Sequence, residues 1–253
     1  MIPMSGLEAA LVFAAGFACG VVNAIAGGGS LILFPALAAT GMGTLSANVT
    51  NSVATWPGYL GSVWGFRKEL EGKHRFLMPL AMATVVGSVI GCWLLLSTST
   101  EMFDQIVPVL VLAAGALVAV QPRLSARVAA GEGRSRRAKI VQLIAIGAAA
   151  VYGGYFGAAL GVIFLGVLGL TVGGSLRELN ALKAALSLID ATVSVVAFSA
   201  FGPVRWGAVL VAAPAALIGG YVGARLARRI DPDLLRILVV GFSVLVAVAL
   251  FAT

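Results

Sequence analysis

Long apolar runs separated by short polar or charged segments dominate this chain. Eight runs are long enough to cross a bilayer as a helix, which takes about 20 residues. They lie at about 7–25, 44–66, 76–97, 103–121, 139–157, 180–201, 204–226 and 232–251. Two shorter apolar pieces, 29–41 and 160–173, each follow a glycine-rich break. The pattern predicts an all-α integral membrane protein, because backbone groups in lipid must find their hydrogen bonds within helices.

The composition favours the same class. Of the 253 residues, 60% are hydrophobic and only 11% are charged, and the mean hydropathy is +1.04. Soluble domains carry roughly 25% charged residues, so this chain has too few polar side chains to cover a water-exposed globule. We therefore expect a multi-pass protein of the cell (inner) membrane that contacts membrane lipid.

The formal net charge of +7 is concentrated on alternate loops. The segments 67–75, 123–139 and 225–233 are basic, whereas 97–105 carries only acids. Basic loops usually stay on the cytoplasmic side of a membrane, which predicts that 97–105 and both termini lie outside the cytoplasm. The same rule explains the positive charge without a nucleic-acid partner. The first residues lack the basic region of a cleavable signal peptide, and none is expected.

The two halves of the chain have the same order of apolar segments. A shift of about 133 residues places Gly20 over Gly153 and the first glycine break over the second. Because the first half would start outside and the second inside, the halves are predicted to be inverted repeats, as in many transporters. Each repeat would be a Gly-broken helical hairpin plus three transmembrane helices, and whether the short segments 29–41 and 160–173 span the membrane or are re-entrant stays open. The predicted parts are a first repeat at 1–122, a basic cytoplasmic linker at 123–138 and a second repeat at 139–253.

The glycine breaks are the first candidate for binding chemistry. The start of a helix presents free N–H groups and a partial positive charge, and glycine lets a ligand approach the backbone closely. A break of this kind is tolerated inside a membrane where it lines a cavity, so it predicts an anion site. The alternative is close helix packing through small residues. The predicted binding residues are Asn23, Gly27, Gly28, Gly29 and Ser30 in the first half and Gly157 and Gly161 in the second.

Four further polar residues lie inside apolar runs. Lys183 and Asp190 are seven residues apart, which places them on one face of a helix. Lys183 could contribute positive charge to the substrate site or could instead extend its amine to the membrane surface. Asp190 could couple transport to protons or could hold a neighbouring polar group in place. Thr50 and Asn51 could donate hydrogen bonds to an anion or cap a helix.

The inventory of reactive side chains argues against catalysis. The chain has one histidine and two cysteines, and both cysteines lie in apolar runs where they read as small buried side chains. We expect no metal site, no cofactor and no enzymatic activity, because a hydrolase needs a nucleophile with a base or a pair of acids.

Two stretches of the chain form recognisable motifs. The first is NAIAGGGSLILFPALAATGMGTLSANVTNSVA at 23–54, with its glycine cluster and Thr50-Asn51 pair. The second is NALKAALSLID at 180–190. Both motifs resemble those of the sulfite exporter TauE/SafE family of membrane proteins, and Leu182 before the lysine departs from the family pattern. The second glycine cluster is also diluted, to GAALG at 157–161. The resemblance covers nearly the whole chain and implies transport of small sulfur-containing anions.

We therefore expect a transporter for a small anion, most simply sulfite or an organosulfonate, that works by alternating access with possible proton coupling. The alternatives are a carrier of small carboxylates or other metabolites on the same scaffold and a membrane protein that does not transport. The spacing of Gly219 and Gly223 could serve a homodimer or packing within one chain.

Overall fold

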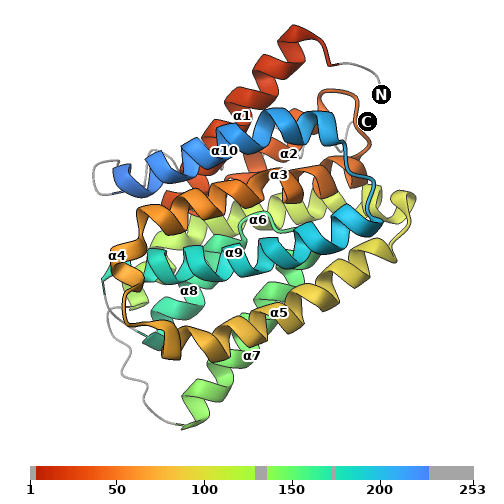
Figure 1. The fold of residues 1–253 in the computed structure, drawn as a ribbon. Helices are drawn as coiled ribbons and strands as arrows, with labels where there is room; N and C mark the ends of the chain where they lie inside the picture. The colour runs from red at the N-terminus through yellow and green to blue at the C-terminus, as the bar shows by residue number, and fades with distance from the viewer. Residues whose placement is uncertain (1–3, 129–135, 173–174, 228–253) are drawn as a thin grey trace.

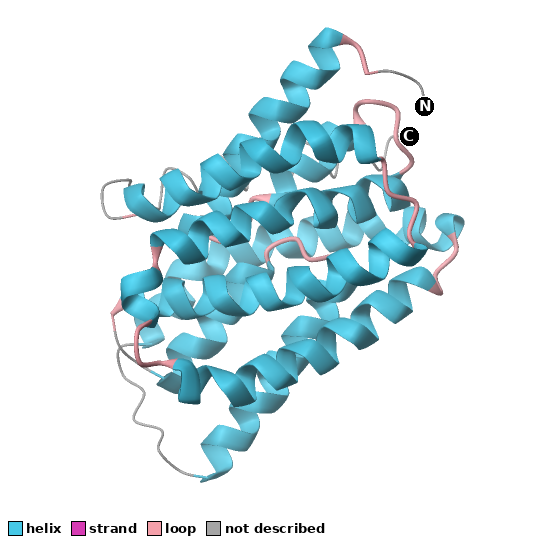
Figure 2. Ribbon diagram, viewed as in Figure 1, coloured by secondary structure: helices cyan, strands magenta, loops and turns pink. Residues whose placement is uncertain are grey.

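The computed structural model describes residues 4–128, 136–172 and 175–227, and every regular element in those residues is a helix (Figures 1 and 2). The first half contributes six and the second half four of them. They are α1 (Gly6–Ile25), α2 (Ser30–Ala38), α3 (Thr44–Gly65), α4 (Arg67–Leu70), α5 (His74–Leu96), α6 (Thr100–Val128), α7 (Arg136–Tyr155), α8 (Leu160–Val172), α9 (Leu176–Phe201) and α10 (Trp206–Leu226).

The predicted all-α membrane class is confirmed. Among the described residues, six helices are long and apolar enough to cross a membrane, namely α1, α5, α9, α10 and the apolar parts of α6 and α7. Helix α3 also has 22 residues, but it falls outside these six because its first half carries Asn48, Thr50 and Asn51 among other polar residues. The predicted run at 232–251 lies outside the described residues.

The two short helices follow the glycine breaks, as the sequence predicted. Helix α2 has 9 residues and α8 has 13. At 1.5 Å per residue they are about 14 and 20 Å long, shorter than the roughly 30 Å hydrocarbon core of a bilayer. Most of their side chains are buried in the bundle. Neither helix is therefore long enough to cross a membrane alone.

Small residues bring the longer helices together. Helix α10 packs on α1 and α3, and α7 packs on α5 (Figure 1). A Cβ atom on Gly219 would overlap the backbone of Phe17, and one on Gly223 would lie 2.7 Å from the Cα of Val21. Gly219 and Gly223 thus serve packing between α10 and α1 of the same chain, one of the two roles that their spacing allowed.

The order of helices repeats along the chain. A helix, a break, a short helix and a long helix stand at α1–α3 and again at α7–α9, and α1 and α9 both begin with a Ser-Glu capping box. The short helices start 130 residues apart, and the left-handed residues Gly27 and Gly157 have the same spacing. The shift of about 133 residues in the sequence comparison differs because that comparison superposed other glycines. The inversion of the second half stays a prediction. Helices α6 and α7 extend into the predicted linker from either side.

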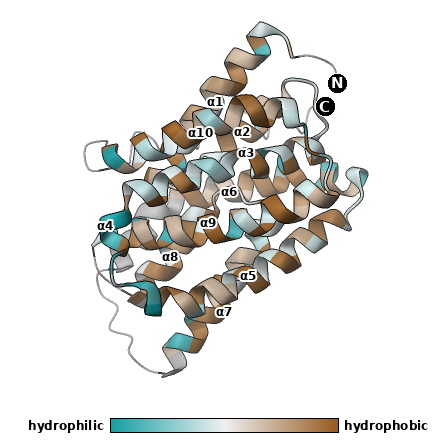
Figure 3. Cartoon of the chain, in the orientation of Figure 1, coloured by the Kyte–Doolittle hydropathy of each residue, from teal (hydrophilic) through white to brown (hydrophobic). Residues whose placement is uncertain are grey.

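Hydrophilic positions gather at one end of the bundle, at α4, the start of α5 and the end of α10 (Figure 3). Two ion pairs tie α9 to this end: Lys73 Nζ lies 2.7 Å from Glu178 Oε1, and Arg177 pairs with Glu69. This is the end that the charge pattern predicts to face the cytoplasm.

Candidate functional site

The two glycine breaks touch each other. A Cβ atom on Gly27 would lie 2.7 Å from the carbonyl carbon of Gly161, and one on Gly161 would lie 2.7 Å from the Cα of Gly27. Real Cβ atoms do not approach backbone so closely, so both positions need glycine. Gly27 also has a φ of +93°, which side-chain-bearing residues rarely adopt. The breaks thus bring segments more than 130 residues apart into backbone contact.

The second break has a similar shape with fewer glycines. Gly157 has a φ of +74° and Ala159 a φ of +60°, and the alanine is unusual in this left-handed region. The hydroxyl of Tyr152 donates a 2.7 Å hydrogen bond to the carbonyl of Ala158. This bond anchors the break to the last turns of α7.

Asn23 bridges the first break. Its Oδ1 accepts a 2.7 Å hydrogen bond from the backbone N–H of Gly29, and its Nδ2 faces Cys19 Sγ at 3.5 Å. The amide of Asn23 therefore connects the end of α1 to the start of α2. In this conformation it is engaged with the protein itself and not directed at a ligand.

Two early amides of α2 also have partners. The N–H of Leu31 donates to the carbonyl of Gly28 at 3.1 Å, and the N–H of Ile32 donates to the carbonyl of Gly29 at 2.9 Å. The prediction that the glycine amides bind an anion stays a prediction.

Replacing Asn23 with alanine is expected to lower the free energy of unfolding by about 1–2 kcal/mol, the usual cost of losing a side-chain acceptor at a helix start. The Gly29 N–H would then be buried without its acceptor. The thermal unfolding midpoint of purified protein measures the change. Ser46→Ala, which removes an exposed hydrogen bond to Pro203, is the control, and an equal midpoint for the two variants would contradict the bridging role.

A small cavity lies beside the breaks. It measures about 20 Å³, room for about one water molecule. Four of the predicted site residues line it: Ser30, Asn51, Gly157 and Asp190. The structure adds lining residues that the sequence analysis did not select: Ser52, Thr55, Tyr59, Gly153, Leu160, Ala191 and Ser194.

Three buried polar stripes converge on this region. On each of α3, α5 and α9, polar side chains recur every three or four residues, which places them on one helix face. Nearly all of them are buried. The stripes are Asn48, Asn51, Ser52, Thr55 and Tyr59 on α3, Thr84 and Ser88 on α5, and Asn180, Lys183, Ser187, Asp190 and Ser194 on α9. This spacing is a signal in the sequence that would have identified Thr55, Ser88 and Ser194.

Asp190 is 5% exposed and lines the cavity. Its Oδ1 accepts a 2.6 Å hydrogen bond from the hydroxyl of Ser88. A Cβ atom on Gly153 would lie 2.6 Å from the same oxygen, so the glycine makes room for the carboxyl group. Asp190 forms no ion pair with a described residue, and Lys183 bonds elsewhere.

Lys183 is 1% exposed and therefore does not extend to the membrane surface. Its Nζ donates to the carbonyl of Ala24 at 3.1 Å and to Asn180 Oδ1 at 2.8 Å. In the other half, Asn48 Nδ2 donates to the carbonyl of Tyr155 at 3.1 Å. Each of these side chains thus caps the last turn of the broken helix that belongs to the other half.

Thr50 and Asn51 have different surroundings although they are neighbours. The Oγ1 of Thr50 accepts a 3.0 Å hydrogen bond from the backbone N–H of Arg205, and Thr50 does not line the cavity. Asn51 lies in the cavity wall, and its buried Oδ1 has no hydrogen-bond partner among the described residues. Within one turn of α3, Thr50 therefore holds the loop before α10 and Asn51 faces the cavity.

The described residues contain no group of three or more histidine, cysteine, aspartate or glutamate side chains that could hold a metal ion. Cys19 and Cys92 are both buried free thiols, as the sequence predicted. The chemistry of the cavity is thus that of hydroxyl groups, one amide and one carboxyl group, which suits hydrogen bonding to a small polar molecule.

Comparison with known proteins adds a family. The model of the family "Sulfite exporter TauE/SafE" matches residues 12–250. The chain is 29% identical over 230 residues to the probable membrane transporter protein YfcA of Escherichia coli K12, which covers 90% of this chain and 82% of the relative. It is 27% identical over 236 residues to a probable membrane transporter protein of Haemophilus influenzae, which covers 92% and 91%. No solved structure matches the chain.

Proposed function

This chain belongs to the sulfite exporter TauE/SafE family of membrane transporters, and on that premise we propose that it carries sulfite or an organosulfonate by alternating access. The observation that carries the proposal is the buried polar cavity beside the two touching breaks. Buried polar groups in a membrane protein usually mark the path of a substrate or ion. Paired broken helices are where such sites lie in transporters built from inverted repeats.

The cavity offers hydrogen-bond donors to an oxyanion. The hydroxyl groups of Ser30, Tyr59 and Ser194 and the amide of Asn51 can all donate. The oxygen atoms of sulfite and of sulfonates only accept hydrogen bonds, which suits this set of donors. The unpartnered carbonyl oxygen of Asn51 would suit a protonated or amino-bearing part of a substrate.

The size of the cavity indicates which state of the transport cycle this conformation represents. Room for about one water molecule is too little for an anion of four or more heavy atoms, so this conformation is closed around the site. The two halves would have to separate to admit a substrate from either side. Inverted repeats in the inner membrane, with both termini outside the cytoplasm, would supply the two equivalent openings.

Ser88 supports a proton-coupled cycle. Its hydroxyl has one hydrogen but faces two acceptors, the carbonyl of Thr84 at 2.7 Å and Asp190 Oδ1 at 2.6 Å. A protonated Asp190 satisfies all three groups: its hydroxyl donates to Ser88, which donates to Thr84. If Asp190 were ionised, its carboxylate and the Thr84 carbonyl would compete for the single hydrogen of the Ser88 hydroxyl. We propose that Asp190 binds a proton in the closed state and releases it when the site opens.

The test is ligand-dependent stability of the purified protein. We expect sulfite, isethionate or sulfoacetate to raise the unfolding midpoint selectively over acetate and lactate. A ligand at 100 times its dissociation constant stabilises by about 2.7 kcal/mol. Tyr59→Phe, which removes a donor from the cavity wall, should reduce the shift. Stabilisation by carboxylates alone would instead favour a metabolite carrier, and no shift with any anion would contradict the site.

A further inference from the structure

A second pocket lies at the hydrophilic end of the bundle, away from the cavity beside the breaks. It measures about 500 Å³, within the usual range of small-molecule sites, about 300–1,000 Å³. Its wall combines four basic side chains with a few small or apolar residues. The lining residues are Arg67, Lys68, Arg177, Arg225, Gly65, Ala224 and Leu226.

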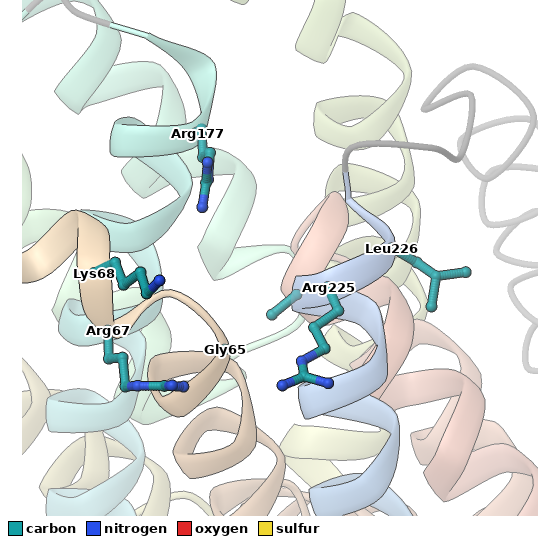
Figure 4. Close-up of a pocket in the computed structure, with 7 residues that line it drawn as sticks. Gly65, Arg67, Lys68, Arg177, Arg225 and Leu226 are labelled. Carbon is teal, nitrogen blue, oxygen red and sulfur yellow. The ribbon is translucent and has the colours of Figure 1, made fainter.

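The basic side chains come from three different elements and point into one space. Figure 4 shows the guanidinium groups of Arg67 and Arg225 directed toward one another across the pocket, with Lys68 and Arg177 on the same side as Arg67. Like charges that face each other repel. Only Arg177 has an acidic partner, Glu69, among the ion pairs of the described residues. The pocket therefore carries a net positive charge, because Arg67, Lys68 and Arg225 have no acidic partner among the described residues.

Aromatic and backbone contacts hold the guanidinium groups in place. Arg225 lies over the ring of Tyr221, with its Cζ 4.4 Å from the ring centroid, and Arg67 lies 5.8 Å from that of Trp64. Arg67 Nη1 also donates to the carbonyl of Trp64 at 3.1 Å. Cation–π contacts of this kind orient the guanidinium plane. These basic groups are thus arranged before any ligand binds.

We propose that this pocket binds a phosphate group. Paired guanidinium groups match the oxygen atoms of phosphate through parallel hydrogen bonds, and several positive charges favour an anion that carries more than one negative charge. The phosphate could belong to a soluble phosphomonoester or to the headgroup of an anionic lipid. The apolar wall at Ala224 and Leu226 suits either the carbon skeleton of the first or the glycerol part of the second. The site does not depend on the proposed transport of sulfur anions.

The double variant Arg67→Gln/Arg225→Gln tests the site, with Arg205→Gln as the matched control. Arg205 is exposed at the opposite end of α10. Unfolding midpoints would be measured in neutral detergent with inorganic phosphate, and in phosphatidylcholine vesicles with and without phosphatidylglycerol. We expect phosphate or phosphatidylglycerol to raise the midpoint of the parent and of Arg205→Gln, and the double variant to lose most of that shift.

The two arms identify the source of the phosphate. A shift with inorganic phosphate supports a soluble ligand, and a shift with phosphatidylglycerol alone supports a lipid headgroup. No shift with either probe, or a shift that the double variant retains, would overturn the proposal. The double variant should still unfold in one cooperative transition. That transition shows that the variant folds, whether or not sulfite binds in the cavity beside the breaks.

Discussion

Replacing Gly27 with alanine is expected to abolish transport and to lower the free energy of unfolding by about 2–5 kcal/mol. About 1–2 kcal/mol of this is the cost of a left-handed backbone at a residue with a side chain. The remainder, about 1–3 kcal/mol, is the overpacking caused by a Cβ atom 2.7 Å from the backbone of Gly161. Thermal unfolding and flux into proteoliposomes measure the two effects.

Gly41→Ala is the matched control for this variant. Gly41 also has a positive φ, +79°, but nothing lies within 4 Å of a Cβ atom placed there. It should therefore show only the smaller, conformational part of the destabilisation and keep its flux. Equal behaviour of Gly27→Ala and Gly41→Ala would mean that the contact between the breaks is unimportant.

Replacing Asp190 with asparagine is expected to reduce transport about tenfold or more, equivalent to at least about 1.4 kcal/mol in the rate-limiting step. The flux that remains should no longer depend on pH. An asparagine can still accept a hydrogen bond from Ser88 through its oxygen or donate one through its amide N–H, but it cannot take up or release a proton. Flux at a series of external pH values, with a fixed substrate gradient, measures the effect.

Asp104→Asn is the control for charge removal alone. Asp104 is exposed and accepts a hydrogen bond from the Thr44 hydroxyl. It should leave the pH profile unchanged. If Asp190→Asn keeps the parental pH profile, Asp190 has a structural role, and proton coupling through this residue is wrong.

The helices of this fold were predictable because membrane helices are long apolar runs between charged loops. Seven of the eight predicted runs coincide with described helices, six of them within about four residues at each end, whereas α6 continues seven residues beyond the predicted run. Both short helices after the breaks were also predicted, because glycines interrupt a helix and an apolar segment in lipid must then resume as a new one. The one-turn helix α4 was missed, because four residues inside a charged loop carry no periodic signal.

Only some of the residues that line the cavity could be predicted from the sequence. Ser30, Asn51, Gly157 and Asp190 line it, but Asn23, Thr50 and Lys183 are engaged with the backbone of other segments. A polar residue in an apolar run signals burial among polar groups, and the sequence alone does not tell whether the partner is a ligand or a carbonyl group. Lys183 shows this well, since its partner Ala24 lies 159 residues away.

The reciprocal caps at Asn48 and Lys183 have a consequence for biogenesis. Each half relies on the other to satisfy the carbonyl groups at its own break. Helix α3, which is long but not apolar enough to count among the six candidate spans of the described residues, packs extensively on α10. When the first half leaves the ribosome, neither partner has yet been synthesised. Helix α3 would then enter the lipid with its asparagine side chains exposed to hydrocarbon, or would remain near the insertion machinery until α9 and α10 are synthesised. Synthesis of the last third of the chain is therefore the step that commits the first third to its place in the membrane.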